Sequence, residues 1–381
     1  MPHTVNKIKV LDNRGKYLFD IIQKNGSITK GQLLDMTRIK LSTLNRSIQF
    51  LLDEKIIVET AIGESTGGRR PILYDVNPCD FYIIGLDISR TYIQVVITNL
   101  KIQIVDEKTF KGSYSLDNLA KIIPSCIENL ILKLKIDKSM IIGIGIGIVG
   151  EVENKEFYKH MLKKEIDVPI FIDNGANTAV LGEYYFGLGK YKNNISYINC
   201  GVGIRTGVIS SGVLIRTINN SEDTLGHMIV DIDGEHCWCG NYGCVESYAS
   251  ITKITEKFIS EVKKGRRIDL NKDLEDINYI DICNLAENKN EIAMNIIVDS
   301  AIHFGTGLAN YIRLFNPQLI ILSGPLIKYS PLFYETCTDI ALEKSHIGKD
   351  IKIEFNRGGY FGDKSIAVGA AVMVIQEILK L

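Results

Sequence analysis

The first 77 residues carry apolar side chains at helical spacing in three short stretches. We expect Asn13 to cap the first helix and Gly26 to end it, because glycine commonly follows the last helical turn. Thr29 and Gln32 have the spacing of a capping box, which predicts the start of a second helix. A third helix is predicted over about residues 41–54, with one apolar face that we expect to be buried (Leu44, Ile48, Leu51 and Leu52).

Two strand-like segments follow the third predicted helix, at residues 56–60 and 72–76. They flank the polar stretch GESTGGRRP, which contains the turn residues expected at the tip of a hairpin. Three helices followed by a hairpin predict a winged helix-turn-helix over residues 1–77. The alternative is a small helical module that contacts another protein.

The exposed face of the third predicted helix carries side chains that can reach base edges in a major groove. These side chains are Ser42, Thr43, Asn45, Arg46 and Gln49. At the hairpin tip Arg69 and Arg70 follow two glycines, where cations suit phosphates or a narrow minor groove. We therefore predict a double-stranded DNA operator as the partner of residues 1–77.

The distribution of charge supports the same prediction. Residues 1–71 hold twelve Lys and Arg against seven Asp and Glu, a net charge of +5. The rest of the chain holds 32 against 38, a net charge of −6. A basic segment attached to an acidic body indicates that the segment, and not the body, meets a polyanion. Chance asymmetry is the alternative on charge alone.

From residue 81 onward, apolar strand pairs alternate with helical patterns, and the alternation occurs twice (residues 81–100, 140–150, 168–187, 195–215 and 304–326). Such a repeat predicts a duplicated α/β fold with a cleft between its halves. We expect three domains, at residues 1–77, 78–190 and 191–381. The chain has no run of 18 apolar residues, and its N-terminus has no apolar stretch like that of a signal peptide. These features predict a cytoplasmic protein that does not enter a membrane.

Three of the eight cysteines lie within eight positions, in the stretch HCWCGNYGC (236–244), which also holds the only tryptophan. Such a cluster indicates a metal site, and the alternative is a group of buried thiols without metal. The other five cysteines are scattered, as expected for thiols in a reducing compartment (Cys79, Cys126, Cys200, Cys283 and Cys337).

The stretch TLGHMIVDIDGEHCWCGNYGCVESYAS (224–250) resembles the signature of the ROK family of bacterial repressors and sugar kinases. STGGRRP (65–71) resembles the junction of its repressor branch. The resemblance implies an α+β multidomain protein, in which a winged helix-turn-helix precedes a duplicated, actin-like (ribonuclease-H-like) body. It places His227, Cys237, Cys239 and Cys244 at the family's metal positions. Four protein ligands would close the tetrahedral shell of one Zn²⁺, which predicts a structural role.

His236 competes with His227 as the histidine ligand of this predicted zinc site. We favour His227, because His236 is adjacent to Cys237 and is poorly placed to join the same shell. Zinc bound through one ring nitrogen of His227 would leave the other nitrogen for a hydrogen bond.

The motifs that the family's kinases use are altered in this chain. The first phosphate turn reads Asp87-Ile88-Ser89-Arg90-Thr91, with Ser89 in place of a glycine, and the second ends in Arg205 instead of a glycine. The catalytic Asp of the family's Asn-Asp-Ala-Asn motif is replaced by Gly175. Loss of a general base typically removes about 10²- to 10⁴-fold in rate. We therefore predict no catalytic residues and no kinase activity.

The family's sugar contacts correspond here to Asn174, His227 and Glu246, which we predict as effector-binding residues. Two carboxylates of the family's set are missing, because Gly175 and Thr224 stand at their positions. The effector would then be a different or modified sugar, or there would be none. For Asn174 and Glu246, polar side chains that tie loops together are an equally supported alternative.

The resemblance implies a homodimeric repressor of carbohydrate uptake or catabolic genes, with xylose-type repressors among the nearest analogues. One head would bind each half of a two-fold operator. Two alternatives remain at this point: a sugar kinase with a regulatory DNA-binding head, and a regulator whose body responds to a transporter protein.

Overall fold

The computed structural model describes residues 8, 11–62, 71–149, 155–216, 224–265, 272–346 and 352–380. The chain forms two compact units. Residues 1–178 and 366–381 make up unit 1, and residues 179–365 make up unit 2. The predicted domain boundaries and the predicted cleft between the halves stay predictions.

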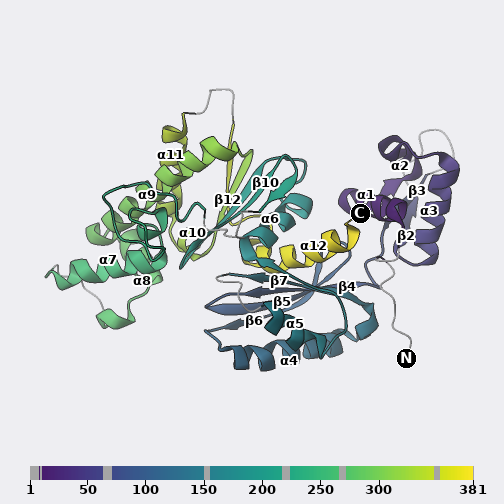
Figure 1. The fold of residues 1–381 in the computed structure, drawn as a ribbon, viewed down its shortest axis with the longest axis horizontal. Coiled ribbons are helices and arrows are strands. Elements are labelled where there is room, and N and C mark those ends of the chain that lie inside the picture. Colours follow the sequence, from purple (N-terminus) through teal and green to yellow (C-terminus); the bar gives the residue numbers. More distant parts are fainter. Residues whose placement is uncertain are drawn as a thin grey trace. The chain divides into compact units, whose positions relative to one another are not determined.

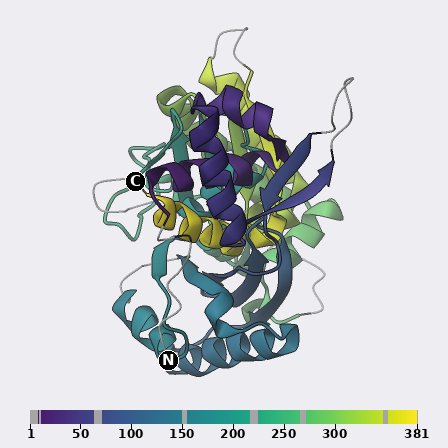
Figure 2. The ribbon, with the colours of Figure 1, turned by 90° about the vertical axis from the view of Figure 1, so that its right-hand side faces the viewer.

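Unit 1 begins with a head of three helices and a small sheet. Its elements are α1 (Asn13–Asn25), β1 (Ile28–Thr29), α2 (Lys30–Thr37), α3 (Leu41–Asp53), β2 (Ile57–Ile62) and β3 (Ile72–Val76). The strands pair in the order β1-β3-β2, and the helices lie beside the β2–β3 hairpin (Figure 2). The head therefore has the predicted arrangement of a helix-turn-helix followed by a wing.

The predicted helix ends at Gly26 and Thr29 are confirmed, whereas the predicted N-terminal cap of α1 is wrong. The Thr29 and Gln32 capping box is present, with the Gln32 amide donating to Thr29 Oγ1 at 3.2 Å. The cap of α1 is Asp12 and not Asn13, because the Asp12 carboxylate accepts from the Gly15 amide at 2.7 Å. The first wing strand also extends to Ile62, beyond the predicted end at residue 60, because β2 continues to pair with β3 past an irregularity between Glu59 and Ala61.

The head is attached to the rest of unit 1 at the turn between β5 (Tyr92–Asn99) and β6 (Ile104–Lys111). Gln23 of α1 is buried, and its Nε2 donates to the Leu100 carbonyl at 2.7 Å. Lys101 Nζ forms an ion pair with Asp75 Oδ2 at 2.8 Å, and Ser27 Oγ donates to the same carboxylate. Leu100 itself is fully buried. The head is therefore bound to the first sheet of the body by side-chain contacts as well as by the chain that connects them.

Each unit contains one five-stranded sheet, and the two sheets have the same plan. Unit 1 has the order β6-β5-β4-β7-β8, with β4 (Tyr82–Ile88), β7 (Ile141–Ile148) and β8 (Ile170–Asn174). Unit 2 has the order β11-β10-β9-β12-β13, from β9 (Ile195–Cys200), β10 (Ile204–Ser210), β11 (Val213–Ile215), β12 (Leu319–Ser323) and β13 (Glu354–Arg357). In both sheets the first three strands of the chain order pair antiparallel with one another. The fourth strand then pairs parallel to the first, and the fifth pairs parallel to the fourth. The predicted duplication of the α/β fold is confirmed.

Helices cover both faces of the unit 1 sheet. The side chains of α4 (Leu116–Leu134) and α5 (Lys155–Lys163) pack in one core with the isoleucines of β7. On the other face lies α12 (Ser365–Leu379), opposite α4 (Figure 1). A side chain at Gly85 or Gly145 would overlap the α12 backbone at Ala367 or Ala370. Gly85 of β4 and Gly145 of β7 therefore allow the helix backbone to lie directly on the sheet.

The remaining helices belong mostly to unit 2. They are α6 (Gly175–Phe186), which begins in unit 1, α7 (Ile251–Lys263), α8 (Tyr279–Glu287), α9 (Glu291–Phe315), α10 (Pro325–Tyr329) and α11 (Pro331–Ser345). Short 3₁₀ turns occur at Lys138–Met140, Val245–Ser247, Leu274–Asp276 and Gly362–Lys364. Among the described residues only α9 is long and apolar enough to span a membrane, and 56% of its apolar window is buried inside the protein. Burial of that extent is typical of a core helix.

Candidate functional site

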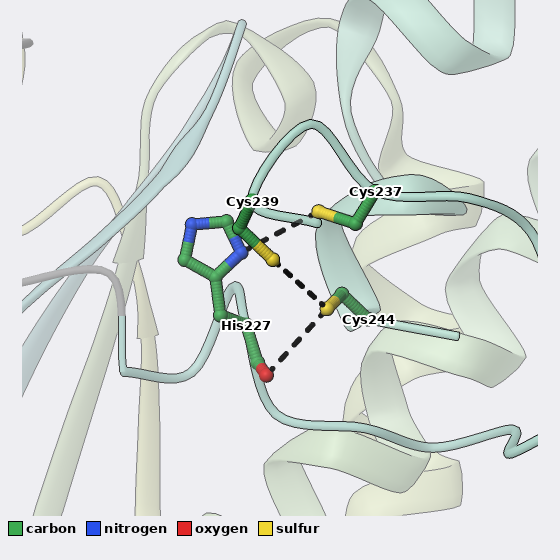
Figure 3. Close-up of side chains that lie close together, drawn as sticks. All are labelled: His227, Cys237, Cys239 and Cys244. Carbon is green, nitrogen blue, oxygen red and sulfur yellow. Dashed lines mark hydrogen bonds between the residues drawn. The ribbon is translucent and has the colours of Figure 1, made fainter. Parts of the chain in front are cut away.

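One cluster of metal-binding side chains is found among the described residues, and it lies in unit 2. His227, Cys237, Cys239 and Cys244 point their ligand atoms toward one another, with all four atoms within 4.8 Å (Figure 3). His236 is not part of the cluster, and its ring lies edge-on against Tyr242. The loop turns sharply at Gly240 and Gly243, whose φ angles of 93° and 70° favour glycine.

The distances within the cluster fit a tetrahedral zinc ion. Cys239 Sγ and Cys244 Sγ are 3.7 Å apart, and Cys237 Sγ lies 3.5 Å from His227 Nδ1. Zinc bonds of about 2.3 Å to sulfur and about 2.0 Å to nitrogen, at tetrahedral angles, require separations of about 3.8 Å and about 3.5 Å. These two separations match a tetrahedral site, and all the other ligand pairs lie within 4.8 Å.

The protonation of the cluster also favours a bound cation. Burial, together with the neighbouring sulfurs of Cys239 and Cys237, raises the pKa of Cys244 to about 12. The pKa of Cys237 is raised by burial but lowered on balance to about 7, chiefly by a hydrogen bond from the Cys239 backbone. Three thiolates this close would repel one another, which together with burial is why Cys244 keeps its proton without a metal ion, and a bound cation would remove that repulsion.

Glu246 connects the cysteine loop to the turn between β9 and β10. Its Oε1 accepts from Trp238 Nε1 at 2.6 Å, and its Oε2 accepts from the Ile204 amide at 2.8 Å. Arg205 also donates to Oε2, at 3.2 Å. Glu246 is 5% exposed, so this carboxylate is buried and hydrogen-bonded on both oxygens. These contacts match the loop-tying alternative for Glu246, and contact with an effector stays a prediction.

Sequence reasoning did not assign roles to Trp238 and Arg205 in this arrangement. The Trp238 ring lies edge-on to His227, with ring centroids 5.0 Å apart, while Arg205 belongs to the second glycine turn. A lone tryptophan between two candidate ligands was the signal available for Trp238. The Arg205 partner could not be found in this way, because it lies on a distant segment of the chain.

Asn174 lies in unit 1, at the end of β8. It is buried, and its Oδ1 accepts from the Ala176 amide at 2.8 Å. This bond satisfies a backbone donor at the start of α6, as a helix cap does. The predicted contact of Asn174 with an effector stays untested, since His227 and Glu246 belong to unit 2.

Gly175 stands where the sequence predicts the loss of a catalytic carboxylate, and the space around its Cα is crowded. A Cβ atom at Gly175 would lie 2.9 Å from Val149 Cγ2 and 3.2 Å from Ile366 Cδ1. Nearby in the sequence, Asp173 Oδ1 accepts from the Asn174 amide at 2.8 Å and from Asn177 Nδ2 at 3.1 Å. Asp173 is therefore held in a local turn.

Asp87, at the first glycine turn, is fully buried in β4. Its Oδ2 accepts from the Tyr92 hydroxyl at 2.7 Å. Burial raises the pKa of Asp87 to about 7, and the bond from Tyr92 offsets part of this rise. The carboxyl group is thus close to half-protonated at neutral pH.

The predicted DNA-reading residues of α3 lie mainly on its exposed face. Ser42, Asn45, Arg46 and Gln49 are exposed, and Thr43 is half-buried. The side chain of Gln49 donates to Asp53 Oδ1 at 2.8 Å. Arg69 and Arg70 lie outside the described residues. Leu44, Ile48 and Leu51 are buried, which confirms most of the apolar face predicted for this helix.

Comparison with known proteins decides the family. The ROK family sequence profile matches residues 83–377. The chain belongs to the ROK family. It is 31% identical to the xylose repressor of Bacillus spizizenii, over 83% of each chain. It is 29% identical to the xylose repressor of Bacillus subtilis strain 168, over 96% of each chain.

Solved ROK structures show the same fold. A crystal structure of a ROK family transcriptional regulator, a homolog of the Escherichia coli MLC protein, matches with a TM-score of 0.80 and 20% identity. It covers 99% of this ROK chain, so the likeness includes the head. A ROK glucokinase from Streptomyces griseus covers 77% of the chain, with a TM-score of 0.65 and 22% identity. The actin-like class expected of the body and the helix-turn-helix head are both confirmed at the level of the fold.

Proposed function

We propose that this chain is a DNA-binding transcriptional repressor that controls genes of sugar metabolism in the cytoplasm. The observation that carries the proposal is its similarity to the Bacillus subtilis xylose repressor over 96% of both chains, which includes the head. The exposed polar face of α3 supplies side chains suited to base edges. The Escherichia coli DNA-binding transcriptional dual regulator NagC, 25% identical over 84% of the chain, supports the same class of function.

In this proposal two heads of a homodimer bind the two halves of an operator. Ser42, Asn45 and Arg46 read bases, while the wing cations Arg69 and Arg70 neutralise phosphate or enter a minor groove. A sugar or sugar derivative bound to the body changes the relative position of the heads and lowers operator affinity. The effector contacts proposed are Asn174, His227 and Glu246.

The body is proposed to have lost kinase chemistry. Phosphoryl transfer needs a group that accepts the proton of the attacking sugar hydroxyl. Gly175 provides none, and the side chains of Val149 and Ile366 occupy the adjacent space. In the second glycine turn, Arg205 is engaged by Glu246. These observations favour a repressor over the alternative of a kinase with a regulatory head.

The zinc ion is proposed to be structural. His227, Cys237, Cys239 and Cys244 would hold it, and a closed tetrahedral shell leaves no position for a reactive water. Bound there, zinc would fix the loop whose Trp238 side chain donates to Glu246.

Operator binding by the purified full-length chain tests the function. Duplexes enriched from a random library should bind with an affinity that falls steeply with salt. Arg46→Ala should weaken binding by about 1–3 kcal/mol and relax the base preference at one position. Arg69→Ala should weaken binding to all duplexes more evenly and reduce the salt slope by about 1.

A coupled ATPase assay over a panel of sugars provides the opposing test. The repressor proposal expects turnover at background. Robust sugar-dependent phosphorylation, or failure to enrich any duplex at low salt, would contradict it.

A further inference from the structure

Two large apolar side chains of α3 are exposed, Leu41 at its start and Phe50 near its end, and the predicted set of DNA contacts includes neither. Leu41 is the first residue of the helix and is 52% exposed. The core of the head takes its leucines and isoleucine from other positions of α3, where Leu44, Ile48 and Leu51 are buried. Leu41 is therefore not part of the core face of α3.

Leu41 lies in the same row as two predicted DNA contacts. Residues four apart in a helix are neighbours on its surface, so Leu41 is followed by Asn45 and then by Gln49. All three are exposed, as are Ser42 and Arg46 in the adjoining row. Phe50 follows Arg46 at the C-terminal end of the adjoining row and is also exposed. Leu41 is the apolar side chain at the N-terminal end of this surface. In helix-turn-helix proteins the N-terminal residues of this helix contact base edges.

The chemistry of the major groove offers one apolar group to such a side chain. Guanine, cytosine and adenine present hydrogen-bond donors and acceptors there, whereas thymine also presents its 5-methyl group. The net charge of +5 over residues 1–71 favours a polyanion over an apolar protein surface as the occupant of this face. We infer that Leu41 contacts the 5-methyl group of a thymine and so sets a preference for thymine in each half-site. This inference rests on the proposed function.

Replacement of single thymines by deoxyuridine tests the contact directly, because uracil lacks only that methyl group. The full-length chain is used with a duplex enriched from a random library, and each thymine is replaced in turn. Wild-type protein should bind about fourfold more weakly when the contacted thymine is replaced, the value for loss of one buried methyl-sized group. The other thymines should show smaller effects.

The Leu41→Ala variant should bind the unmodified duplex more weakly and should not distinguish thymine from uracil at that position. The losses of binding free energy from Leu41→Ala and from the thymine-to-uracil replacement would then not add, which is the sign of a direct contact. Arg46→Ala is the matched control in the same helix, because it should lose affinity but keep the full thymine preference. Alanine is favourable in helices, so Leu41→Ala should leave the thermal midpoint of the protein unchanged.

Two results would overturn the inference while leaving the proposed function intact. One is a Leu41→Ala variant that keeps the full penalty for uracil. The other is wild-type protein that tolerates uracil at every position. If Leu41→Ala instead changes the oligomeric mass, a second copy of the chain covers this residue, and the inference is wrong. Failure to enrich any duplex would overturn both this inference and the proposed function.

Discussion

At the scale of single residues, the buried carboxyl group of Asp87 makes the stability of unit 1 depend on pH. Burial raises its pKa from 3.8 to about 7 in the folded protein. The folded state therefore holds a proton that the unfolded state releases above about pH 4. The stability from this group is complete below pH 4, falls by about 1.4 kcal/mol per pH unit up to about pH 7, and then levels off.

The variant Asp87→Asn should remove this part of the pH dependence, because an amide does not titrate. Urea unfolding of both proteins between pH 5 and 8.5 should show wild-type stability falling relative to the variant as pH rises to 7. Asp35→Asn in α2 is the control, since Asp35 is exposed and its change should leave the profile unaltered. Parallel profiles for wild type and Asp87→Asn would show that the carboxyl group is ionised throughout.

Residue-level features were predictable where their cause is local in the sequence. The four clustered ligands were found because three lie within eight positions and the resemblance supplied His227. The hydrogen bonds of Glu246 could not be predicted from the sequence, because Ile204 and Arg205 belong to β10, about forty residues earlier in the chain. The crowding at Gly175 was also hidden, since Ile366 comes from the start of the last helix.

At the scale of elements, the cysteine loop has a built-in spectroscopic reporter. Trp238 is the only tryptophan of the chain, lies against His227 and donates to Glu246 at 2.6 Å. If zinc holds this loop, a strong chelator should shift Trp238 emission and lower the thermal midpoint by several degrees. Loss of 1 kcal/mol lowers the midpoint by about 2–4 °C in a unit of this size.

Cys239→Ser should reproduce the effect of the chelator and reduce the zinc content measured by atomic absorption. Cys79→Ser is the matched control, because Cys79 is an exposed thiol outside the cluster. Full zinc content in Cys239→Ser, or unchanged emission after metal removal, would contradict the assigned ligand set or its structural role.

The sheets show how far element patterns determine the fold. Both antiparallel strand pairs and the duplication of the α/β fold were predictable from alternating apolar segments, but the strand order within each sheet was not predicted. The place of α12 was not predicted, because the glycines of β4 and β7 were interpreted only as parts of buried strands. The structure shows their role, since the α12 backbone lies against Gly85 of β4 and Gly145 of β7. A glycine pattern of this kind identifies a close approach but does not say which helix makes it.

At the scale of the whole molecule, the head is attached to unit 1 by contacts as well as by the chain. Gln23 is buried and bound to the Leu100 carbonyl, and Asp75 is paired with Lys101. We expect these contacts to make the head move with the first sheet. In the proposed dimer, the two heads would therefore have a defined separation and orientation.

A fixed pair of heads makes operator affinity depend on the helical phase of the two half-sites. B-DNA repeats every 10–10.5 base pairs, so inserting about five base pairs between half-sites places them on opposite faces of the duplex. With five inserted base pairs only one head can bind, so wild-type affinity should fall by more than about tenfold. With about ten inserted base pairs both half-sites lie on the same face again, and affinity should recover in part. The combined change Gln23→Ala and Lys101→Ala should reduce this dependence by loosening the head, whereas Lys24→Ala, at an ion pair within α1, should not. Equal affinity of the wild-type protein at every spacing would mean that each head binds independently, and the fixed attachment would not govern operator recognition.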